Sequence, residues 1–247
     1  MKYFIGNWKM FGVPKSLNIL IKINSFYSKD KNNGKYRVII TPPFTLIETY
    51  SKYFKFKKLI IGSQNCYQKD KFSSNTGAIS PYMLRSIGAK YTLVGHSDNR
   101  SEGDTNIQLK EKVKFAVKNN LKVVFCIGEN KSEKKNKKTF KVLTKQIKKV
   151  LEKKFFKKNI MVAYEPIWSI GTGKIPSKIE LRKTTAHIKK VLKSIFKTNS
   201  VPVLYGGSVD EKTIEIFKEI KEIDGFLIGG ASKSSKNFID IIKNYYR

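Results

Sequence analysis

The chain has 247 residues, 40% of them hydrophobic, with 50 basic against 19 acidic side chains and a net charge of +31. Its apolar runs are only as long as strands, which argues against a membrane span of ~20 consecutive apolar residues. Two cysteines and two histidines, all far apart in the sequence, argue against a zinc site. We expect Cys66 and Cys126 to be reduced and buried, and the chain, which lacks a signal-peptide pattern, to be cytoplasmic.

The positive charge suggests a nucleic-acid-binding protein. However, 45 of the basic residues are lysine and only 5 are arginine, the residue suited to bidentate and stacking contacts. The lysines are spread over almost every predicted helix, and Lys, Asn, Ile, Phe and Tyr are abundant together. This pattern favours compositional drift towards A/T-rich codons, although a positive field would also attract an anionic substrate.

Strand and helix patterns alternate along the whole chain. Strands are predicted at residues 2–8, 36–41, 59–64, 89–94, 121–127, 160–164, 201–205 and 224–228. Helical patterns are predicted at 14–29, 44–53, from 80, and at 104–119, 131–158, 177–196, 211–220 and 237–245. In the helix at 104–119 we expect Ile107, Val113 and Val117 to face the core.

Eight strand-then-helix units without a linker predict an α/β protein with one domain over residues 1–247, a closed (β/α)8 barrel. An open doubly wound sheet is the main alternative, but no Gly-x-Gly-x-x-Gly follows the first strand. In a parallel barrel all strands point their carboxyl ends at one mouth. The polar and glycine residues expected there are Asn7, Lys9, Gln64, Asn65, His96, Glu129, Glu165, Gly206, Gly207, Gly229 and Gly230.

Residues 161–174 are the most informative stretch for function. A buried strand pattern is followed at once by Glu165 and then by a loop that runs from Pro166 to Lys174. A carboxylate at a strand tip below such a loop is typical of a catalytic base under a lid. The glycine-rich loops after the last two strands indicate a phosphate site, so we expect a phosphorylated ligand. Lys9 could neutralise its charge and His96 could donate a proton to an oxygen, with no metal or cofactor required.

Over essentially its whole length, the chain resembles the triosephosphate isomerase family of the bacterial type. The shared motifs are Gly6-Asn7-Trp8-Lys9, Gln64-Asn65-Cys66, Gly95-His96-Ser97, Cys126-Ile127-Gly128-Glu129, Tyr164-Glu165-Pro166-Ile167-Trp168, Gly171-Thr172-Gly173-Lys174, Tyr205-Gly206-Gly207-Ser208 and Gly229-Gly230-Ala231-Ser232. The resemblance implies a TIM barrel and an isomerase of glycolysis and gluconeogenesis. It would interconvert dihydroxyacetone phosphate and D-glyceraldehyde 3-phosphate through an enediolate.

The resemblance also implies roles for individual residues. Glu165 would be the base and His96 the electrophile, acting as a neutral imidazole as is known for the family. Lys9 and Asn7 would stabilise and position the enediolate and phosphate charges. Backbone N–H groups of Gly171, Ser208, Gly229 and Gly230 would bind the phosphate. The lid would consist of Pro166, Ile167, Trp168, Ser169, Ile170, Gly171, Thr172, Gly173 and Lys174, and its closure would exclude water and limit phosphate elimination.

The family is dimeric, and Thr76 is implied to reach the active site of the partner. This chain departs from the family near that interface, with Asp98, Asn99, Ala78 and Asp104 where Glu, Arg, Glu and Glu are usual. We expect the shorter Asp98 to loosen a bond to the backbone near Lys9, and the interface to be weaker. Ser169 replaces the usual lid alanine, and we expect its hydroxyl to have little effect.

Two other functions remain open at this point. Another phosphate-binding barrel isomerase would need a different set of residues, such as paired acids or metal-binding histidines. A basic nucleic-acid-binding side activity is the second alternative, which the lysine-dominated composition disfavours. No cofactor and no membrane partner are expected.

Overall fold

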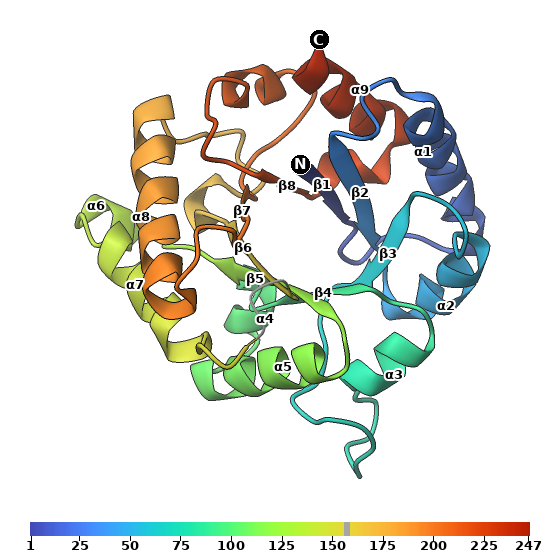
Figure 1. Ribbon diagram of the computed structural model, residues 1–247, viewed down its shortest axis with the longest axis horizontal. Coiled ribbons are helices and arrows are strands. Elements are labelled where there is room, and N and C mark those ends of the chain that lie inside the picture. Colours follow the sequence, from blue (N-terminus) through green and yellow to red (C-terminus); the bar gives the residue numbers. More distant parts are fainter. Residues whose placement is uncertain (156–158) are drawn as a thin grey trace.

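In the computed structural model, which describes residues 1–155 and 159–247, eight parallel strands close into a barrel (Figure 1). The strands are β1 (Lys2–Asn7), β2 (Tyr36–Thr41), β3 (Ile60–Ser63), β4 (Tyr91–Val94), β5 (Lys122–Ile127), β6 (Ile160–Tyr164), β7 (Val203–Tyr205) and β8 (Gly225–Ile228). Each strand pairs with the next, and β8 pairs with β1. The predicted (β/α)8 barrel is therefore confirmed, and the open doubly wound sheet is wrong.

Helices surround the barrel on the outside (Figure 1). The α-helices are α1 (Leu17–Lys29), α2 (Phe44–Tyr53), α3 (Pro81–Ser86), α4 (Ser97–Ser101), α5 (Asn106–Lys118), α6 (Lys131–Lys135), α7 (Thr139–Val150), α8 (Lys178–Phe196) and α9 (Ser235–Tyr246). Short 3-10 helices are η1 (Pro14–Ser16), η3 (Ile167–Ser169), η4 (Thr213–Phe217) and η5 (Gly230–Lys233). No described helix is long and apolar enough to cross a membrane.

The alternation of side chains along each strand creates two hydrophobic cores. In β1, Phe4 belongs to the large core between strands and helices, whereas Ile5 belongs to the small core that fills the barrel. Successive strand residues point to opposite faces, so both faces of these strands must be apolar. Cys66 and Cys126 are free and buried in these two cores, as predicted.

Three details of the predicted helices are wrong. The pattern at 131–158 is not one helix, because α6 and α7 are separated by a turn in which Lys137 has a left-handed φ of 55°. Residues 156–158 of that prediction lie outside the described residues. The helix predicted at 211–220 is only the 3-10 helix η4, and Ile107, expected in the core, is 79% exposed at the start of α5.

A buried ion pair supports the long loop after β3. The Lys112 ammonium contacts both Asp104 carboxylate oxygens, at 2.7 and 2.8 Å, and the Asn65 side-chain oxygen at 3.1 Å. Lys112 is buried, so these partners replace the water that its ammonium loses. The aspartate that replaces the family's usual glutamate therefore still pairs with the lysine that fixes the base of this loop.

Candidate active site

The carboxyl ends of the strands surround a cavity of about 320 Å³. The residues lining it come from the carboxyl ends of five strands, β1, β4, β6, β7 and β8, and the loops that follow them. They include Asn7, Lys9, His96, Glu165, Gly171, Ser208, Gly229 and Gly230, which are all the residues predicted for catalysis or phosphate binding. Three residues predicted at the same mouth do not line this cavity: Gln64, Asn65 and Glu129. Their side chains form hydrogen bonds with Lys9, Lys112 and Trp168, respectively.

Lys9 enters the cavity from an unusual backbone conformation. Its φ is 54°, in the left-handed region that non-glycine residues rarely adopt. Two side chains hold this conformation: the Asn7 Oδ1 accepts the Lys9 N–H at 3.1 Å, and the Gln64 amide donates to the Lys9 carbonyl at 2.8 Å. The polar residues at the ends of β1 and β3 thus fix the position of the lysine.

The Lys9 ammonium lies 3.0 Å from the Asp98 Oδ2. The sequence led us to expect a loosened bond between Asp98 and the nearby backbone, but it gave no sign of this direct ion pair. Both side chains are partly exposed, so water screens the attraction and the pair is weak. An arriving anion can therefore compete with Asp98 for the lysine.

His96 follows β4 and caps the amino end of α4. Its Nδ1 lies 3.1 Å from the backbone nitrogen of Asp98. Because a backbone N–H can only donate, Nδ1 must accept and carries no proton, which assigns the neutral imidazole with its proton on Nε2. The Nε2 faces Glu165, whose Oε1 is 3.5 Å away.

Glu165 follows β6 and is 4% exposed. Its Oε2 has no hydrogen-bond partner among the described residues, and burial raises the pKa of the carboxyl above its usual value near 4.5. Gly206 lies directly behind the side chain, since a Cβ there would be 2.7 Å from the Glu165 Cγ. The carboxylate is thus held in a dry, narrow space facing His96.

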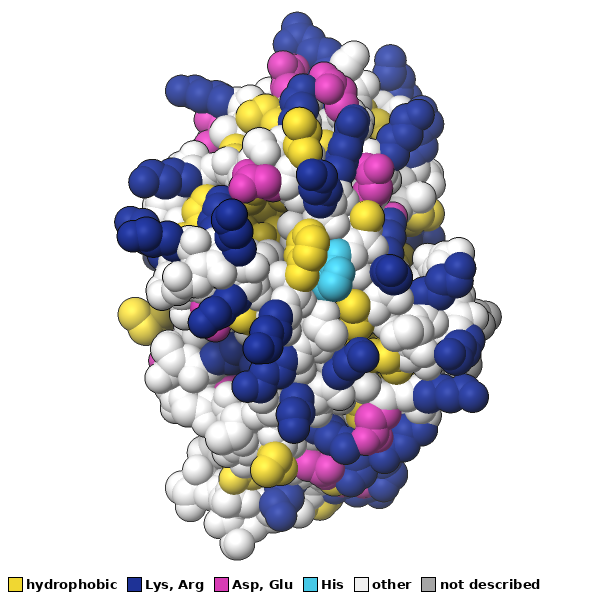
Figure 2. All heavy atoms as spheres, turned by 90° about the vertical axis from the view of Figure 1, so that its left-hand side faces the viewer, with side chains coloured by type: hydrophobic (Ala, Val, Ile, Leu, Met, Phe, Trp, Pro, Cys, Tyr) yellow, Lys and Arg dark blue, Asp and Glu magenta, His cyan; other side chains and the backbone are white. Residues whose placement is uncertain are grey.

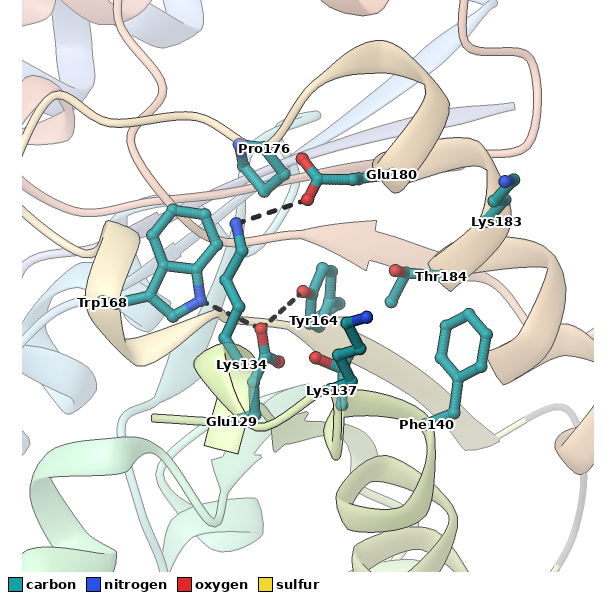
Figure 3. A pocket seen from close by; sticks show the side chains of 11 residues that line it. Glu129, Lys134, Lys137, Phe140, Tyr164, Trp168, Pro176, Glu180, Lys183 and Thr184 are labelled. Carbon is teal, nitrogen blue, oxygen red and sulfur yellow. Dashed lines mark hydrogen bonds and ion pairs between the residues drawn. The ribbon is translucent and has the colours of Figure 1, made fainter. Parts of the chain in front are cut away.

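The amino-terminal end of the lid is anchored by Glu129, as Figure 3 shows. The Glu129 Oε1 accepts hydrogen bonds from the Trp168 indole at 2.9 Å and from the Tyr164 hydroxyl at 3.1 Å. The Lys134 ammonium lies 3.5 Å from the centre of the Trp168 ring, and burial raises the pKa of Glu129. Sequence reasoning placed Glu129 at the mouth but missed this contact with the lid.

The other end of the lid contacts the loop after β7. The Gly173 N–H donates to the Ser208 Oγ at 3.0 Å, and that hydroxyl donates to the Ser169 carbonyl at 2.6 Å. Ser169 is fully buried and its own hydroxyl is hydrogen-bonded. We expected this hydroxyl to have little effect, and the structure adds that it is buried and bonded to the Lys174 carbonyl and the Tyr205 hydroxyl.

The remaining predicted residues and charges lie away from the cavity. Thr76 is exposed in the long loop that projects from the barrel between β3 and α3 (Figure 1).

Figure 2 shows basic side chains scattered over the face formed by α6, α7 and α8, with single acidic groups between them. Within residues 1–155 and 159–247, no group of three or more His, Cys, Asp or Glu side chains could hold a metal ion.

Comparison with known proteins identifies close similarities over the whole chain. The family model described as triosephosphate isomerase matches residues 2–245. Proteins named triosephosphate isomerase from Leptospira interrogans and Dictyoglomus thermophilum are 36% and 34% identical, covering 96% and 98% of this chain and 97% and 99% of the relatives. The crystal structure of triosephosphate isomerase from Bartonella henselae matches with a TM-score of 0.91 and 30% identity, covering 100% of this chain and 99% of that chain.

The burial of Glu165 predicts an effect on stability that does not depend on any activity. The folded-state pKa is raised, so an ionised Glu165 destabilises the fold above that pKa, and the penalty disappears as the pH falls through it towards 4.5. Glu165→Gln should therefore unfold at a higher temperature than the wild type at pH 7, with a difference that shrinks on acidification. Thermal unfolding followed by circular dichroism between pH 4 and 8 measures this.

The matched control is Glu102→Gln, because Glu102 is exposed. Its difference from the wild type should stay small across the same pH range. Equal pH profiles for the Glu165 and Glu102 variants would show that burial does not perturb the Glu165 carboxyl.

Proposed function

The chain belongs to the triosephosphate isomerase family, and we propose that the cavity at the carboxyl end of its barrel is the site of that reaction. The enzyme is an aldose–ketose isomerase that interconverts dihydroxyacetone phosphate and D-glyceraldehyde 3-phosphate. The observation that carries the proposed site is the buried Glu165 carboxylate, which faces the Nε2 of a neutral His96 at 3.5 Å.

In the proposed mechanism, Glu165 removes a proton from the carbon next to the substrate carbonyl and returns it to the neighbouring carbon. Burial raises the pKa of this carboxyl, which makes the carboxylate a stronger base than an exposed one. His96 donates from Nε2 to the carbonyl oxygen and stabilises the developing enediolate. Its neutral state suits this role, because a neutral imidazole can donate to one oxygen and later exchange the proton with the other.

Lys9 balances the negative charge of the enediolate and the phosphate. The ion pair between the Lys9 ammonium and Asp98 is partly exposed to water and therefore weak. The dianionic substrate can thus displace the carboxylate. Asn7 acts with it, because its side chain fixes the Lys9 backbone and also lines the cavity. In this proposal, side chains of the protein balance the charge of the substrate, and no metal or cofactor takes part.

The phosphate binds to backbone N–H groups of Gly171, Ser208, Gly229 and Gly230 in this proposal. A Cβ at Gly229 or Gly230 would meet no atom within 4 Å, so both glycines face open space in the cavity. The lid, residues 166–174, closes over the phosphate, keeps water out and limits elimination from the enediolate. A different phosphate-binding barrel isomerase is not favoured, since the relatives carry one name and His96 is the one histidine lining the cavity.

We further propose a homodimer. Residues 71–77 of the loop after β3 are all exposed, including Phe72 at 76%, and Met10 beside Lys9 is 99% exposed. Such apolar groups on projecting loops are costly in water and are typical of an interface. Thr76 would then approach the Lys9 side of the partner's cavity.

One domain over residues 1–247 and a cytoplasmic location are part of the same proposal. The two free cysteines are compatible with a reducing compartment.

Glu165→Gln tests the proposed function directly. Removal of the base should lower kcat by about 10³-fold in a coupled isomerase assay, with little change in KM, because the phosphate contacts are untouched. A variant that retains wild-type turnover would refute Glu165 as the base.

Gly206→Ala tests whether the position of the carboxylate matters. The added methyl group would lie 2.7 Å from the Glu165 Cγ and 3.1 Å from its Oε1, so the side chain must move away from the substrate. We expect kcat to fall by about 10²-fold with a cooperative, folded protein. The control is Gly34→Ala, where no atom lies within 4 Å of the added Cβ. Normal kinetics in both variants would contradict the predicted placement of Glu165.

Sedimentation tests the dimer. Phe72→Glu should raise the dimer dissociation constant by at least about tenfold, whereas Phe56→Glu, which changes a phenylalanine 91% exposed before β3, should not. Each protomer carries +31, so added salt should strengthen the dimer by screening repulsion. A wild-type chain that is fully active as a monomer at micromolar concentration would contradict the proposed homodimer.

A further inference from the structure

A second cavity lies beside the barrel, apart from the catalytic mouth, and Figure 3 shows it from close by. Its volume is about 230 Å³, and its walls come from β6, the turn between α6 and α7, and the start of α8. The residues that line it differ from all those that line the catalytic cavity. Pockets for drug-sized ligands measure ~300–1,000 Å³, so an occupant of this cavity must be smaller.

One wall of this cavity carries a buried carboxylate with an unused oxygen. Glu129 is 1% exposed, and its Oε1 accepts hydrogen bonds from the Trp168 indole and the Tyr164 hydroxyl (Figure 3). Its Oε2 is buried and has no hydrogen-bond partner within residues 1–155 and 159–247. A buried acceptor without a donor is destabilising, so this oxygen favours a ligand that brings an N–H group.

Two lysines that also line the cavity are free to attract an anion. Lys137 and Lys183 are exposed, and neither forms an ion pair in the part of the chain that the structure describes. Lys134 differs from them, because its ammonium lies 3.5 Å from a Glu180 oxygen and 3.5 Å from the centre of the Trp168 ring. The cavity therefore combines an unused acceptor with two unpaired cations.

The backbone at Lys137 gives independent support for a site. Its φ of 55° lies in the left-handed region, which glycine adopts at lower cost than lysine. The turn is closed by the Lys137 N–H, which donates to the Lys134 carbonyl at 2.9 Å. Residues held in such conformations are found preferentially at ligand and active sites, and here the strained residue contributes a cation to the cavity.

Apolar side chains form much of the remaining wall. Trp168 and Phe140 stand on opposite sides of the cavity, with Pro176 above (Figure 3). Phe140 is 43% exposed, but its ring stacks on His187 with centres 4.4 Å apart and an interplanar angle of 9°. This wall suits a short hydrocarbon segment, which would be removed from water on binding.

We propose that this cavity binds a small zwitterion, with an ammonium group at the Glu129 Oε2, a carboxylate at Lys137 and Lys183, and a short apolar chain between them. A simple anion would leave the Glu129 oxygen without a donor, and a simple amine would be repelled by the lysines. Among the described residues neither lysine pairs with Glu129, so the two charged ends of the ligand must be separated by a spacer. Amino acids with a terminal amine have this chemistry. The inference goes beyond the isomerase reaction and does not depend on it.

The test titrates 4-aminobutanoate and 6-aminohexanoate into the full chain. Binding is followed by calorimetry and by tryptophan fluorescence, because Trp168 lines the cavity whereas Trp8, the second tryptophan, is fully buried in the large core. Butanoate, hexanoate, butylamine and hexylamine are the matched ligands that lack one charge. At least one of the two amino acids should bind about tenfold more tightly than either of its own analogues.

Three variants assign the binding to this cavity. Glu129→Gln retains the shape of the side chain and should raise the Kd about tenfold, because it removes a charge-assisted hydrogen bond. Lys137→Gly removes a cation where the backbone suits glycine, so it should fold, and it should raise the Kd about threefold, as expected for an exposed pair. The control is Lys138→Ala, which removes the charge of an exposed neighbour outside the cavity and should leave the Kd unchanged.

The proposal is overturned if the amino acids bind no more tightly than their analogues, or if Glu129→Gln keeps the wild-type Kd. Should Glu129→Gln fail to fold, the comparison of Lys137→Gly with Lys138→Ala decides, and equal Kd values would overturn the site. A cavity that takes only water would give no heat and no fluorescence change with either amino acid, which also overturns it. Because binding is the readout, an inactive or a fully active Glu165→Gln protein leaves this result unchanged.

Discussion

The proposed site depends on keeping one carboxylate buried beside a histidine, with only one of its oxygens facing that ring. Glu165 is ionisable, 4% exposed and lacks a partner for its Oε2 among the described residues. Burial of a charge is unfavourable, and the fold must hold it there with the packing of many other residues. The closed barrel supplies this, because β6 delivers Glu165, β4 delivers His96, and Gly206, which lacks a side chain, leaves room for the Glu165 side chain beside it.

His96 is the second group on which this arrangement depends. A charged imidazolium beside Glu165 would neutralise the carboxylate and weaken it as a base. The backbone N–H of Asp98 at the start of α4 donates to the Nδ1 lone pair at 3.1 Å, and the Asp98 Oδ2 lies farther away at 3.4 Å, an arrangement that fits the neutral ring. The electrostatics of the proposed reaction therefore come from a backbone dipole, which a change of side chain at Asp98 does not remove. The shorter acid at that position therefore leaves this contact of His96 in place.

The sequence allowed the barrel and the cavity to be predicted because both follow from repeated local patterns. Eight apolar strands with polar ends determine where side chains such as Lys9 and Glu165 must meet. The failures have local causes. The turn at Lys137 depends on a left-handed backbone in a lysine-rich stretch, where a single asparagine, Asn136 at the end of α6, is a weak turn signal. In the predicted helix at 211–220, the Asp210 side chain accepts the N–H groups of Lys212 and Thr213, which favours a tight turn over a regular helix.

The hydroxyl contacts of the lid could not have been predicted, because they join residues brought together only by the fold. Their chemistry also fits a segment that, in the proposed mechanism, opens in every turnover. Trp168 is fixed through an indole N–H, and the opposite end through Ser169 and Ser208; among residues 1–155 and 159–247, no ion pair ties the lid to the barrel. Each such bond exchanges with water at a modest net cost, whereas a buried ion pair would not. The lid can therefore be held firmly by several weak bonds and still release its product.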